Sequence, residues 1–474
     1  GGAPPPARRP HPSVPLPGPR AASTTQPRYA KLAGRQTAIP SLRTVSAFMT
    51  HRSFHIVSLG CKVNQYDGQA LRERLLALGL AEAPLSARPD VVVVNTCAVT
   101  SRADEKCRQR VRAAVKASPG ALVIVTGCGA AVAPERFRAI PGVSLILAKE
   151  DLSSIGEVLD GRPACRGGAW DLTVSDFGER DRAFLKIQDG CDAFCSYCIV
   201  PYARGKPRSR PLADIGDEAR RLADRGFAEI VLTGVHLGLY GQDLAGATLV
   251  QAVRQVLAAR SVARVRISSI EVMEVTDDLL ALMASEERLC PHLHLPLQSG
   301  DNEVLRAMNR RYTAADFLRV VDKARRALDR PAITTDVLVA FPGETDAQAA
   351  NTLRVCEQAA FSRMHVFRYS RRPGTAAARL PLVNGQAAAE REAAAIALAR
   401  DLALRHRRSF VGQTVAPLTE SRRDKATGML TGFTERYAPV LFQGPDTLMG
   451  RIARVRAVEA GDEAILGERI APAP

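Results

Sequence analysis

The feature of this sequence that most restricts its fold is a repeated alternation of short apolar, β-branched runs with longer helical patterns. Three such runs lie at residues 54–59, 91–94 and 122–126, and helical patterns at 67–78 and 104–116 separate them. Continuous apolar strands joined through helices predict a parallel sheet that is covered on both faces. We therefore expect a small doubly wound α/β domain at residues 53–175.

The same alternation continues six more times between about residue 180 and residue 408. The expected strands lie at 183–188, 229–233, 265–269, 292–297, 334–340 and 364–369, with helices such as 214–224, 313–328 and 386–406 after them. Six successive βα units predict an open, partial version of the eight-fold βα barrel, in which the active site lies at the carboxyl ends of the strands. We assign residues 176–408 to this barrel.

Short strands with glycine turns replace the helical patterns in the last part of the chain. Runs at 412–418, 429–434, 439–442 and 448–457 predict a small closed β-barrel at residues 409–474, of a kind often used on RNA. Eight basic and eight acidic residues balance one another from residue 411 onward, so charge alone does not mark this region as a binder.

The net charge of +16 on 474 residues indicates a polyanionic partner such as nucleic acid, but part of it lies in the first residues. Residues 1–50 carry seven Lys or Arg, no acid and ten prolines, so we predict a disordered, basic, Pro-rich extension at 1–52. It resembles an organelle transit peptide, but its prolines disfavour the amphipathic helix that such peptides form. We interpret it as an upstream extension of little consequence, or a misplaced start before Met49. No apolar run approaches 18 residues, so no transmembrane helix is expected.

Three cysteines form the strongest chemical signal in the chain. Cys191, Cys195 and Cys198 stand four and three residues apart, just after an expected strand. Three thiolates at this spacing reach one [4Fe-4S] cluster and leave its fourth iron open for a substrate or cofactor. The alternatives are structural zinc or reduced thiols, although zinc needs a fourth ligand and the nearest downstream histidine is His236.

A second set of three cysteines occupies one structural position. Cys61, Cys97 and Cys128 each stand one or two residues past the carboxyl end of an expected parallel strand, at the edge where α/β sheets bind ligands. A single such cysteine is usually packing, but three predict a second cluster. Packing is our interpretation of the other four, which are Cys107, Cys165, Cys290 and Cys356.

On these motifs the chain resembles the radical S-adenosylmethionine (SAM) enzymes, through its Cys-x3-Cys-x2-Cys loop on a βα barrel. The run Ser-Leu-Gly-Cys-Lys-Val-Asn-Gln-Tyr-Asp at 58–67, Asn95-Thr-Cys97 and Gly127-Cys128 make it resemble the methylthiotransferases among them. That family combines an N-terminal cluster domain, a radical-SAM core and a terminal TRAM domain, and the resemblance covers about residues 53 to 470.

The resemblance implies two [4Fe-4S] clusters and SAM as both radical source and methyl donor. Cys191, Cys195 and Cys198 would hold the cluster that chelates SAM, and the other three cysteines the cluster that carries the inserted sulfur. Carbon 2 of adenine is not acidic, so its C–H bond calls for a radical, and no acid-base dyad is expected. The candidate SAM contacts lie at strand ends, and each is equally suited to cap a helix or satisfy backbone: Thr233, Gly234, Val235, Ser268, Ser269, Glu271, Gln298 and Asp336.

The branch of the family follows from longer runs. Two branches modify the tRNA adenosine 3' of the anticodon, when its N6 carries threonylcarbamoyl or isopentenyl, and a third modifies an aspartate of a ribosomal protein. The runs at 60–67, 95–100 and 232–238 look most like the threonylcarbamoyladenosine branch. The other two branches, and a non-catalytic iron-sulfur RNA-binding protein, are the alternatives.

Basic residues near the expected barrel mouth predict contacts with tRNA phosphates. They are Arg204, Lys206, Arg208, Arg210, Arg371 and Arg372, with Arg310 and others after neighbouring strands. His236 and His294 are interpreted as satisfied polar residues rather than ligands. We also expect a flavodoxin or ferredoxin as reductant, no membrane contact and a monomeric state. A cytoplasmic location is expected because oxygen-sensitive clusters and unpaired thiols need a reducing compartment.

Overall fold

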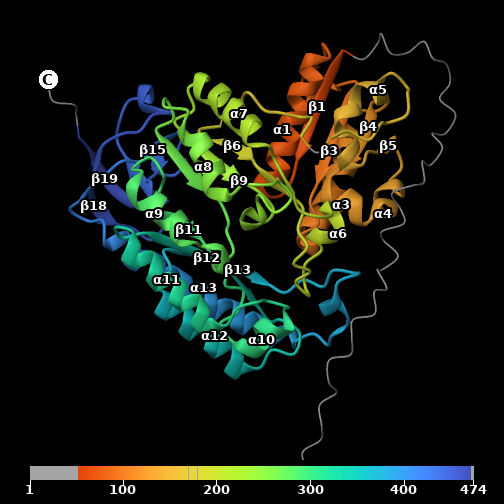
Figure 1. The fold of residues 1–474 in the computed structure, drawn as a ribbon. Coiled ribbons are helices and arrows are strands. Elements are labelled where there is room, and N and C mark those ends of the chain that lie inside the picture. The colour runs from red at the N-terminus through yellow and green to blue at the C-terminus, as the bar shows by residue number, and fades with distance from the viewer. Residues whose placement is uncertain (1–51, 169, 179, 471–474) are drawn as a thin grey trace, which may run out of the picture. The chain divides into compact units, whose positions relative to one another are not determined.

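The computed structural model describes residues 52–168, 170–178 and 180–470 (Figure 1). Apart from Arg52, the extension predicted at 1–52 lies outside the described residues. None of the helices in the described part of the chain combines the length and apolar character that a membrane span requires.

The N-terminal region contains a parallel five-stranded sheet, as predicted. Its strand order is β2 (Ala81–Glu82), β1 (Ser53–Ser58), β3 (Val91–Thr96), β4 (Leu122–Thr126) and β5 (Leu145–Ile146). Val91 and Val93 pack on one face with α1 (Lys62–Ala77) and α5 (Ile155–Leu159). Val92 and Val94 pack on the other face with α2 (Ser101–Ala117) and α4 (Pro134–Arg138). Because both faces are covered, the central strand has no polar side to display.

Six parallel strands build the central region. They lie in the order β6 (Ala183–Lys186), β9 (Glu229–Thr233), β10 (Arg264–Ile267), β11 (His292–His294), β12 (Ala332–Val339) and β13 (Arg363–Arg368). A bridge between Ser269 and His294 joins the two three-stranded halves. In the described chain no ladder pairs β6 with β13, so the barrel is open on that side, as the six βα units predicted. A two-stranded hairpin of β7 (Gln188–Asp189) and β8 (Arg208–Ser209) was not predicted.

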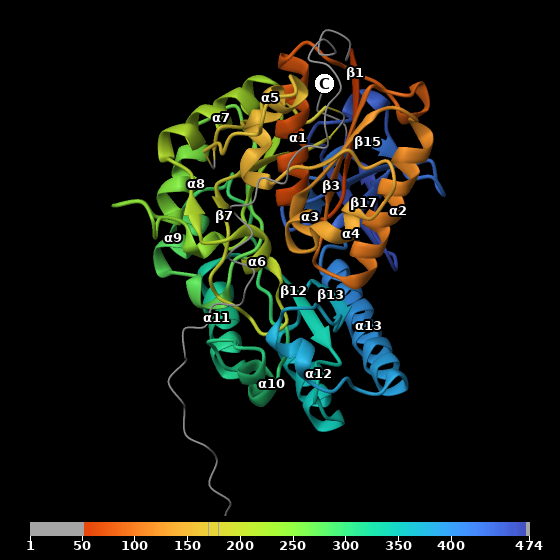
Figure 2. The ribbon, with the colours of Figure 1, turned by 90° about the vertical axis from the view of Figure 1, so that its right-hand side faces the viewer.

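Helices cover the outside of these six strands and supply most of the central core. Figure 2 shows α12 and α13 beside β12 and β13. Thr248, Thr313 and Thr345 each form a capping box at the start of a helix, which fixes where α8, α11 and α12 begin. The helices of this region are α6 (Val200–Arg204), α7 (Leu212–Asp224), α8 (Leu249–Leu257), α9 (Asp277–Ser285), α10 (Asn302–Ala307), α11 (Ala314–Ala327), α12 (Asp346–Ala359) and α13 (Gly385–Arg408). Short 3-10 turns lie at Leu85–Ala87, Lys149–Ser154, Leu237–Leu239, Val272–Glu274, Ala376–Arg379 and Asp446–Leu448.

The C-terminal region is a six-stranded mixed sheet, consistent with the expected TRAM barrel. Its order is β14 (Thr414–Val415), β18 (Val455–Ala460), β19 (Ile465–Arg469), β17 (Pro439–Phe442), β16 (Leu430–Phe433) and β15 (Leu418–Arg423). Backbone hydrogen bonds from Thr419 to Arg451 and from Gly450 to Thr419 join the β15 edge to the segment before β18. These bonds close the sheet on itself and so protect its edge.

A buried arginine connects the central strands to the C-terminal sheet. Nε of Arg266 lies 2.8 Å from Oε1 of Glu229, and its Nη1 donates to the carbonyl oxygen of Glu435 at 2.8 Å. Its guanidinium carbon lies 4.5 Å from the ring centroid of Tyr437. A charge buried this completely is tolerated because it is paired on every side.

We expect Arg266→Leu to lower the free energy of unfolding by about 3–5 kcal/mol, because Glu229 would remain as a buried carboxylate that has lost its closest partner. Urea denaturation followed by circular dichroism measures this change. Arg405→Leu, which removes exposed ion pairs with Glu357 and Asp401, is the control and should leave the transition nearly unchanged. Equal midpoints for both variants would contradict the role of Arg266.

Candidate metal centres

Three neighbouring strands of the N-terminal sheet each lead to a cysteine. Cys61 precedes α1 after β1, Cys97 follows β3, and Cys128 is the second residue of α3 (Gly127–Val132) after β4. Strands β1, β3 and β4 are adjacent in the sheet, so their carboxyl ends meet at one edge. The structure therefore brings the three predicted thiols to the same place.

The side chain of Asn64 ties these strand ends together. Its Nδ2 donates to the carbonyl oxygens of Leu59 and Thr96 at 2.8 and 2.9 Å, and its Oδ1 lies 3.7 Å from Sγ of Cys128. Burial, with smaller contributions from the neighbouring thiols of Cys128 and Cys61, raises the pKa of Cys97 to about 11. Thiols grouped this closely suit a metal, which binds the thiolate and displaces the proton.

Two small residues fix the position of Cys97. Gly60 has φ of 109°, and a Cβ atom there would lie 3.0 Å from Sγ of Cys97, so a larger residue would press on the thiol. The backbone nitrogen of Cys97 donates to Sγ of Cys107 at 3.2 Å.

Cys107, Cys290 and Cys356 are buried, in line with the packing interpretation. That interpretation is wrong for Cys165, which is exposed.

The second set of thiols lies in the loop that follows β7. The amide of Cys198 donates to the carbonyl oxygen of Cys195 at 2.9 Å, which turns the loop back on itself. Asn309 Nδ2 donates to the carbonyl oxygens of Ala193 and Phe194, each at 3.1 Å. The loop enters at Gly190, whose φ of 79° favours glycine and where a Cβ would collide with backbone of the returning strand. The protein itself thus holds this loop in shape.

Cationic side chains face two of these three sulfurs. Nδ1 of His236 lies 3.4 Å from Sγ of Cys191, while its Nε2 lies 2.6 Å from Glu274. Burial opposes the charged imidazole, but the hydrogen bonds to Cys191 and Glu274 prevail and raise the pKa of His236 to about 10. Nη1 of Arg310 lies 3.6 Å from Sγ of Cys195. Three soft thiols with adjacent cations, which offset the negative charge of a thiolate-ligated cluster, fit an iron-sulfur cluster.

A buried ionic network lies between the two sets of thiols. Arg204, whose residue is 2% exposed, donates from Nε to Sγ of Cys128 at 3.1 Å. Its Nη1 lies 3.0 Å from Asp189 Oδ1, and its Nη2 lies 3.0 Å from Asp67 Oδ2 and 2.6 Å from Asn64 Oδ1. Arg204 belongs to α6, which follows the second thiol loop, and α3 and α6 lie side by side (Figure 1). The guanidinium of Arg204, on the helix after the second set of thiols, therefore contacts the thiol of Cys128 in the first set.

Two lysines complete this network, which combines three cationic side chains with two carboxylates. Lys186 contacts Asp67 and lies 3.3 Å from Asp189, and Lys149 contacts Asp189. Burial alone would raise the pKa of Asp189, but Lys149, Arg204 and Lys186 hold it well below its usual range. Burial lowers the pKa of Lys149. Burial raises the pKa of the Cys128 thiol, so a third anion joins this network only when a metal displaces the thiol proton.

The predicted phosphate contacts are corrected at four arginines. Arg204 and Arg210 are buried, and Nη2 of Arg210 lies 2.8 Å from Glu218. Arg372 is buried against the loop of Ser101, and Arg310 faces Cys195. A run of charges looks exposed in sequence because the carboxylates that pair with it lie on other structural elements. Lys206 and Arg371 are exposed and Arg208 is half-buried, and their contact with RNA stays a prediction.

The predicted SAM contacts divide into two levels of the barrel. Thr233 and Gly234 end β9, where a Cβ at Gly234 would lie 3.0 Å from Gln188. Glu271 contacts Arg310 beside the thiol loop, and Gln298, four residues past the end of β11, adopts φ of 63°. Val235 is half-buried, and Ser268 is buried. Ser269 forms a β-bridge with His294, and the carboxylate of Asp336 lies between the rings of His294 and His365. The role of each toward SAM stays a prediction.

Sequence reasoning did not identify Asn64, Gln188, Arg204, Arg310 or His365 as parts of these centres. Gln188 accepts a hydrogen bond from the amide of His236 at 2.8 Å and donates to the carbonyl oxygen of Gly190 at 2.8 Å. Asn64 and Arg204 stand three and six residues after a cysteine, and that proximity was the available signal.

Comparisons with known proteins agree with this arrangement. Residues 53–148 match the uncharacterized protein family UPF0004, and residues 185–356 match the Radical SAM superfamily. The chain is 36% identical over 425 residues to the threonylcarbamoyladenosine tRNA methylthiotransferase MtaB of Bacillus subtilis, covering 86% of this chain and 94% of that protein. It is 34% identical to the protein of that name from Thermotoga maritima, covering 88% and 97%.

A second group of relatives carries another name. A tRNA-2-methylthio-N(6)-dimethylallyladenosine synthase of Cereibacter sphaeroides is 32% identical over 437 residues, covering 88% of this chain and 99% of that protein. Among solved structures, the radical SAM methyltransferase TsrM of Kitasatospora setae has a TM-score of 0.55 at 15% identity, covering 69% of this chain and 74% of that chain. The TsrM likeness concerns the fold alone.

Arg204 is expected to tune the N-terminal centre, because a cation that donates to a thiolate stabilises the more negative, reduced state. Arg204→Gln should shift the midpoint potential of a cluster on Cys61, Cys97 and Cys128 by about 60 to 130 mV to more negative values, the equivalent of one charged hydrogen bond. Arg204→Lys, which keeps the charge, should shift it less.

The measurement is an anaerobic redox titration followed by electron paramagnetic resonance in a Cys195→Ala background, so that one cluster is observed. Lys206→Gln, an exposed neighbour in the same segment, is the matched control. Identical potentials for the Arg204 and Lys206 variants would refute the contact.

Proposed function

The chain belongs to the radical-SAM methylthiotransferase family, and we propose that it methylthiolates carbon 2 of N6-threonylcarbamoyladenosine, 3' of the anticodon in tRNA. The observation that carries this proposal is the pair of three-thiol sets joined through Arg204, which contacts Cys128 from the helix after Cys198. A radical enzyme without sulfur insertion needs only the second set. The relatives from Bacillus and Thermotoga support the choice of substrate through their names.

The residues of each set have distinct tasks in this reaction. Cys191, Cys195 and Cys198 would hold the cluster that binds SAM, and Cys61, Cys97 and Cys128 the cluster that receives sulfur. When bound, these groups and SAM supply the radical chemistry, the sulfur atom and the methyl group. The protein holds the thiols in place through Asn64 and Asn309.

Two cations complement the charge of the SAM-binding centre. His236 and Arg310 lie against Cys191 and Cys195 and offset the charge of their thiolates. Cys198 is half-buried, and desolvation raises the pKa of its thiol to about 12.

The remaining parts of the proposal concern partners. Lys206, Arg208 and Arg371 would contact tRNA phosphates, since they are the members of the predicted basic set that are not buried. A one-electron reductant such as a flavodoxin or ferredoxin would supply electrons to a monomeric enzyme in the cytoplasm. The second candidate is the branch that acts on isopentenyladenosine, which is also called dimethylallyladenosine. A relative named for dimethylallyladenosine aligns with 88% of the chain at 32% identity.

Cys195→Ala should abolish formation of 5'-deoxyadenosine from SAM under reducing conditions and lower the iron content from about eight to about four per chain, since each cluster holds four irons. Iron analysis and chromatography of the SAM products measure both. Cys165→Ala, at an exposed cysteine outside both sets, should match the wild type. A wild-type protein that reconstitutes with four irons would exclude the second cluster, and one that forms no 5'-deoxyadenosine would favour a non-catalytic RNA-binding protein.

Nucleoside mass spectrometry of tRNA tests the substrate. Deletion of the gene should remove the 2-methylthio derivative of threonylcarbamoyladenosine and leave the unmethylthiolated nucleoside in its place. A plasmid copy should restore the derivative, and a copy with Cys97→Ala should not. Loss of the methylthio group from isopentenyladenosine instead would place the enzyme in the other tRNA branch, and an unchanged tRNA profile would direct attention to a ribosomal protein.

A further inference from the structure

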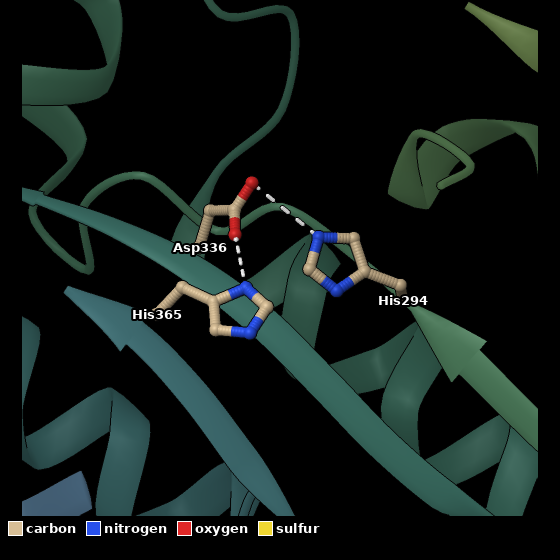
Figure 3. A group of neighbouring side chains, drawn as sticks. All are labelled: His294, Asp336 and His365. Atoms are coloured by element: carbon tan, nitrogen blue, oxygen red, sulfur yellow. Dashed lines mark hydrogen bonds and ion pairs between the residues drawn. The ribbon is translucent and has the colours of Figure 1, made fainter. Parts of the chain in front are cut away.

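Three polar side chains from adjacent strands meet inside the barrel. His294 of β11, Asp336 of β12 and His365 of β13 bring their ligand atoms within 4.8 Å of one another (Figure 3). Ile333, Val337 and Val339 of β12 pack in the core that the outer helices share. Because side chains alternate along a strand, Asp336 points to the opposite side, the barrel interior.

Hydrogen bonds along this group have one consistent direction. Asp336 keeps a pKa well below its usual range because bonds from both histidines outweigh the effect of burial, so its carboxylate accepts. Its Oδ1 lies 3.1 Å from Nδ1 of His365 and its Oδ2 lies 3.4 Å from Nε2 of His294, so these two nitrogens carry protons. Oγ1 of Thr334 lies 2.9 Å from Nδ1 of His294 and 3.1 Å from Nε2 of His292, so it forms a hydrogen bond with each ring.

This pattern disfavours a metal ion at the three residues. A nitrogen that donates its proton to a carboxylate has no lone pair left for a cation. His294 uses both ring nitrogens within the group, as expected for a satisfied polar residue, and the carboxylate of Asp336 lies between the rings.

One atom of the group remains available to a ligand. Nε2 of His365 has no hydrogen-bond partner among the described residues, and the side chain is 43% exposed. An aspartate that holds Nδ1 of a histidine orients the ring and directs its Nε2 outward, as in hydrolase triads. His365 is therefore a fixed polar group that faces the open interior.

A short series of contacts connects the group to the thiol loop. His294 stands two residues before Pro296, whose carbonyl oxygen accepts from Nη2 of Arg310 at 3.2 Å, and Nη1 of Arg310 reaches Cys195. Two residues along a strand correspond to about 7 Å. A base positioned for reaction beside the thiol loop would thus extend its substituent toward His365.

We propose that His365, held by Asp336, binds the carboxylate of the threonylcarbamoyl substituent on the target adenosine. The inference rests on the proposed function and names the residue that reads the polar end of its substrate. In its protonated form His365 donates from Nε2 to the carboxylate, while its Nδ1 donates to Asp336. Asp336 has lone pairs left to accept from the threonyl hydroxyl.

The same residues select against an apolar substituent. An isopentenyl group would exclude water from His365 and Asp336 and offer no hydrogen bond in return, and a buried polar group without a partner is costly. A site of this kind favours the polar substrate by the penalty that it imposes on the apolar one.

The test is a cycle that removes the histidine and the carboxylate in turn. Anticodon stem-loops carrying threonylcarbamoyladenosine, or its carboxamide analogue, are given to the reconstituted wild type and to His365→Gln. The wild type should lose about 10- to 100-fold in kcat/KM on the amide, as expected for a charged hydrogen bond, and His365→Gln should lose a similar factor on the carboxylate. The variant should then discriminate little between the two RNAs.

Matched controls separate this role from a structural one. His365→Gln should keep about eight irons, which shows that both clusters still assemble in the variant. His55→Gln, at a histidine of β1 that bonds to the carbonyl oxygen of Ala83, should retain wild-type kcat/KM. Undiminished discrimination between acid and amide by His365→Gln would overturn the inference while leaving the proposed function intact. A wild type that methylthiolates only the isopentenylated RNA would refute the proposed function itself.

Discussion

The buried guanidinium of Arg204 is the interaction on which the arrangement of both centres depends. It contacts Cys128 and Asp67 from the N-terminal sheet and Asp189 from the strand before the second thiol loop. Asp189 in turn accepts from the amide of Gly190, the residue that precedes Cys191. Removing charges from water is expensive, and a buried network repays that cost only when every member is paired. Neither centre can move relative to the other without breaking several of these contacts.

The same electrostatic solution appears at both sets of thiols. Arg204 faces Cys128, while His236 and Arg310 face Cys191 and Cys195. Thiolates that surround a cluster give it a negative charge, and a buried site must balance this charge. The network around Arg204 contains three cationic side chains and two carboxylates, and burial lowers the pKa of Lys149 among the cations. A thiolate at Cys128, which a bound metal would require, adds an anion to this network.

Sequence patterns predicted the elements that have a strong period and missed those that do not. Strand Val91–Thr96 was evident because both of its faces are buried, whereas the hairpin of Gln188–Asp189 with Arg208–Ser209 has two residues a side and no pattern. The six cysteines predicted as ligands could be grouped because each set shares one spacing or one structural position. The arginines misled, because Asp67 and Glu218, which bury Arg204 and Arg210, come from elements 137 and 8 residues away. A charge looks like surface until its partner is placed beside it.

The side chains inside the barrel bear on the choice of substrate more directly than the overall sequence identity to relatives does. The two groups of relatives differ by only a few per cent in identity to this chain. Inside the barrel, by contrast, a single polar residue without a partner changes the balance between two substituents by more than an order of magnitude. His365 and Asp336 form a hydrogen-bonded polar pair where an apolar pocket would serve an isopentenyl group better. Their arrangement is therefore a physical argument for a polar substituent, independent of the names that similar proteins carry.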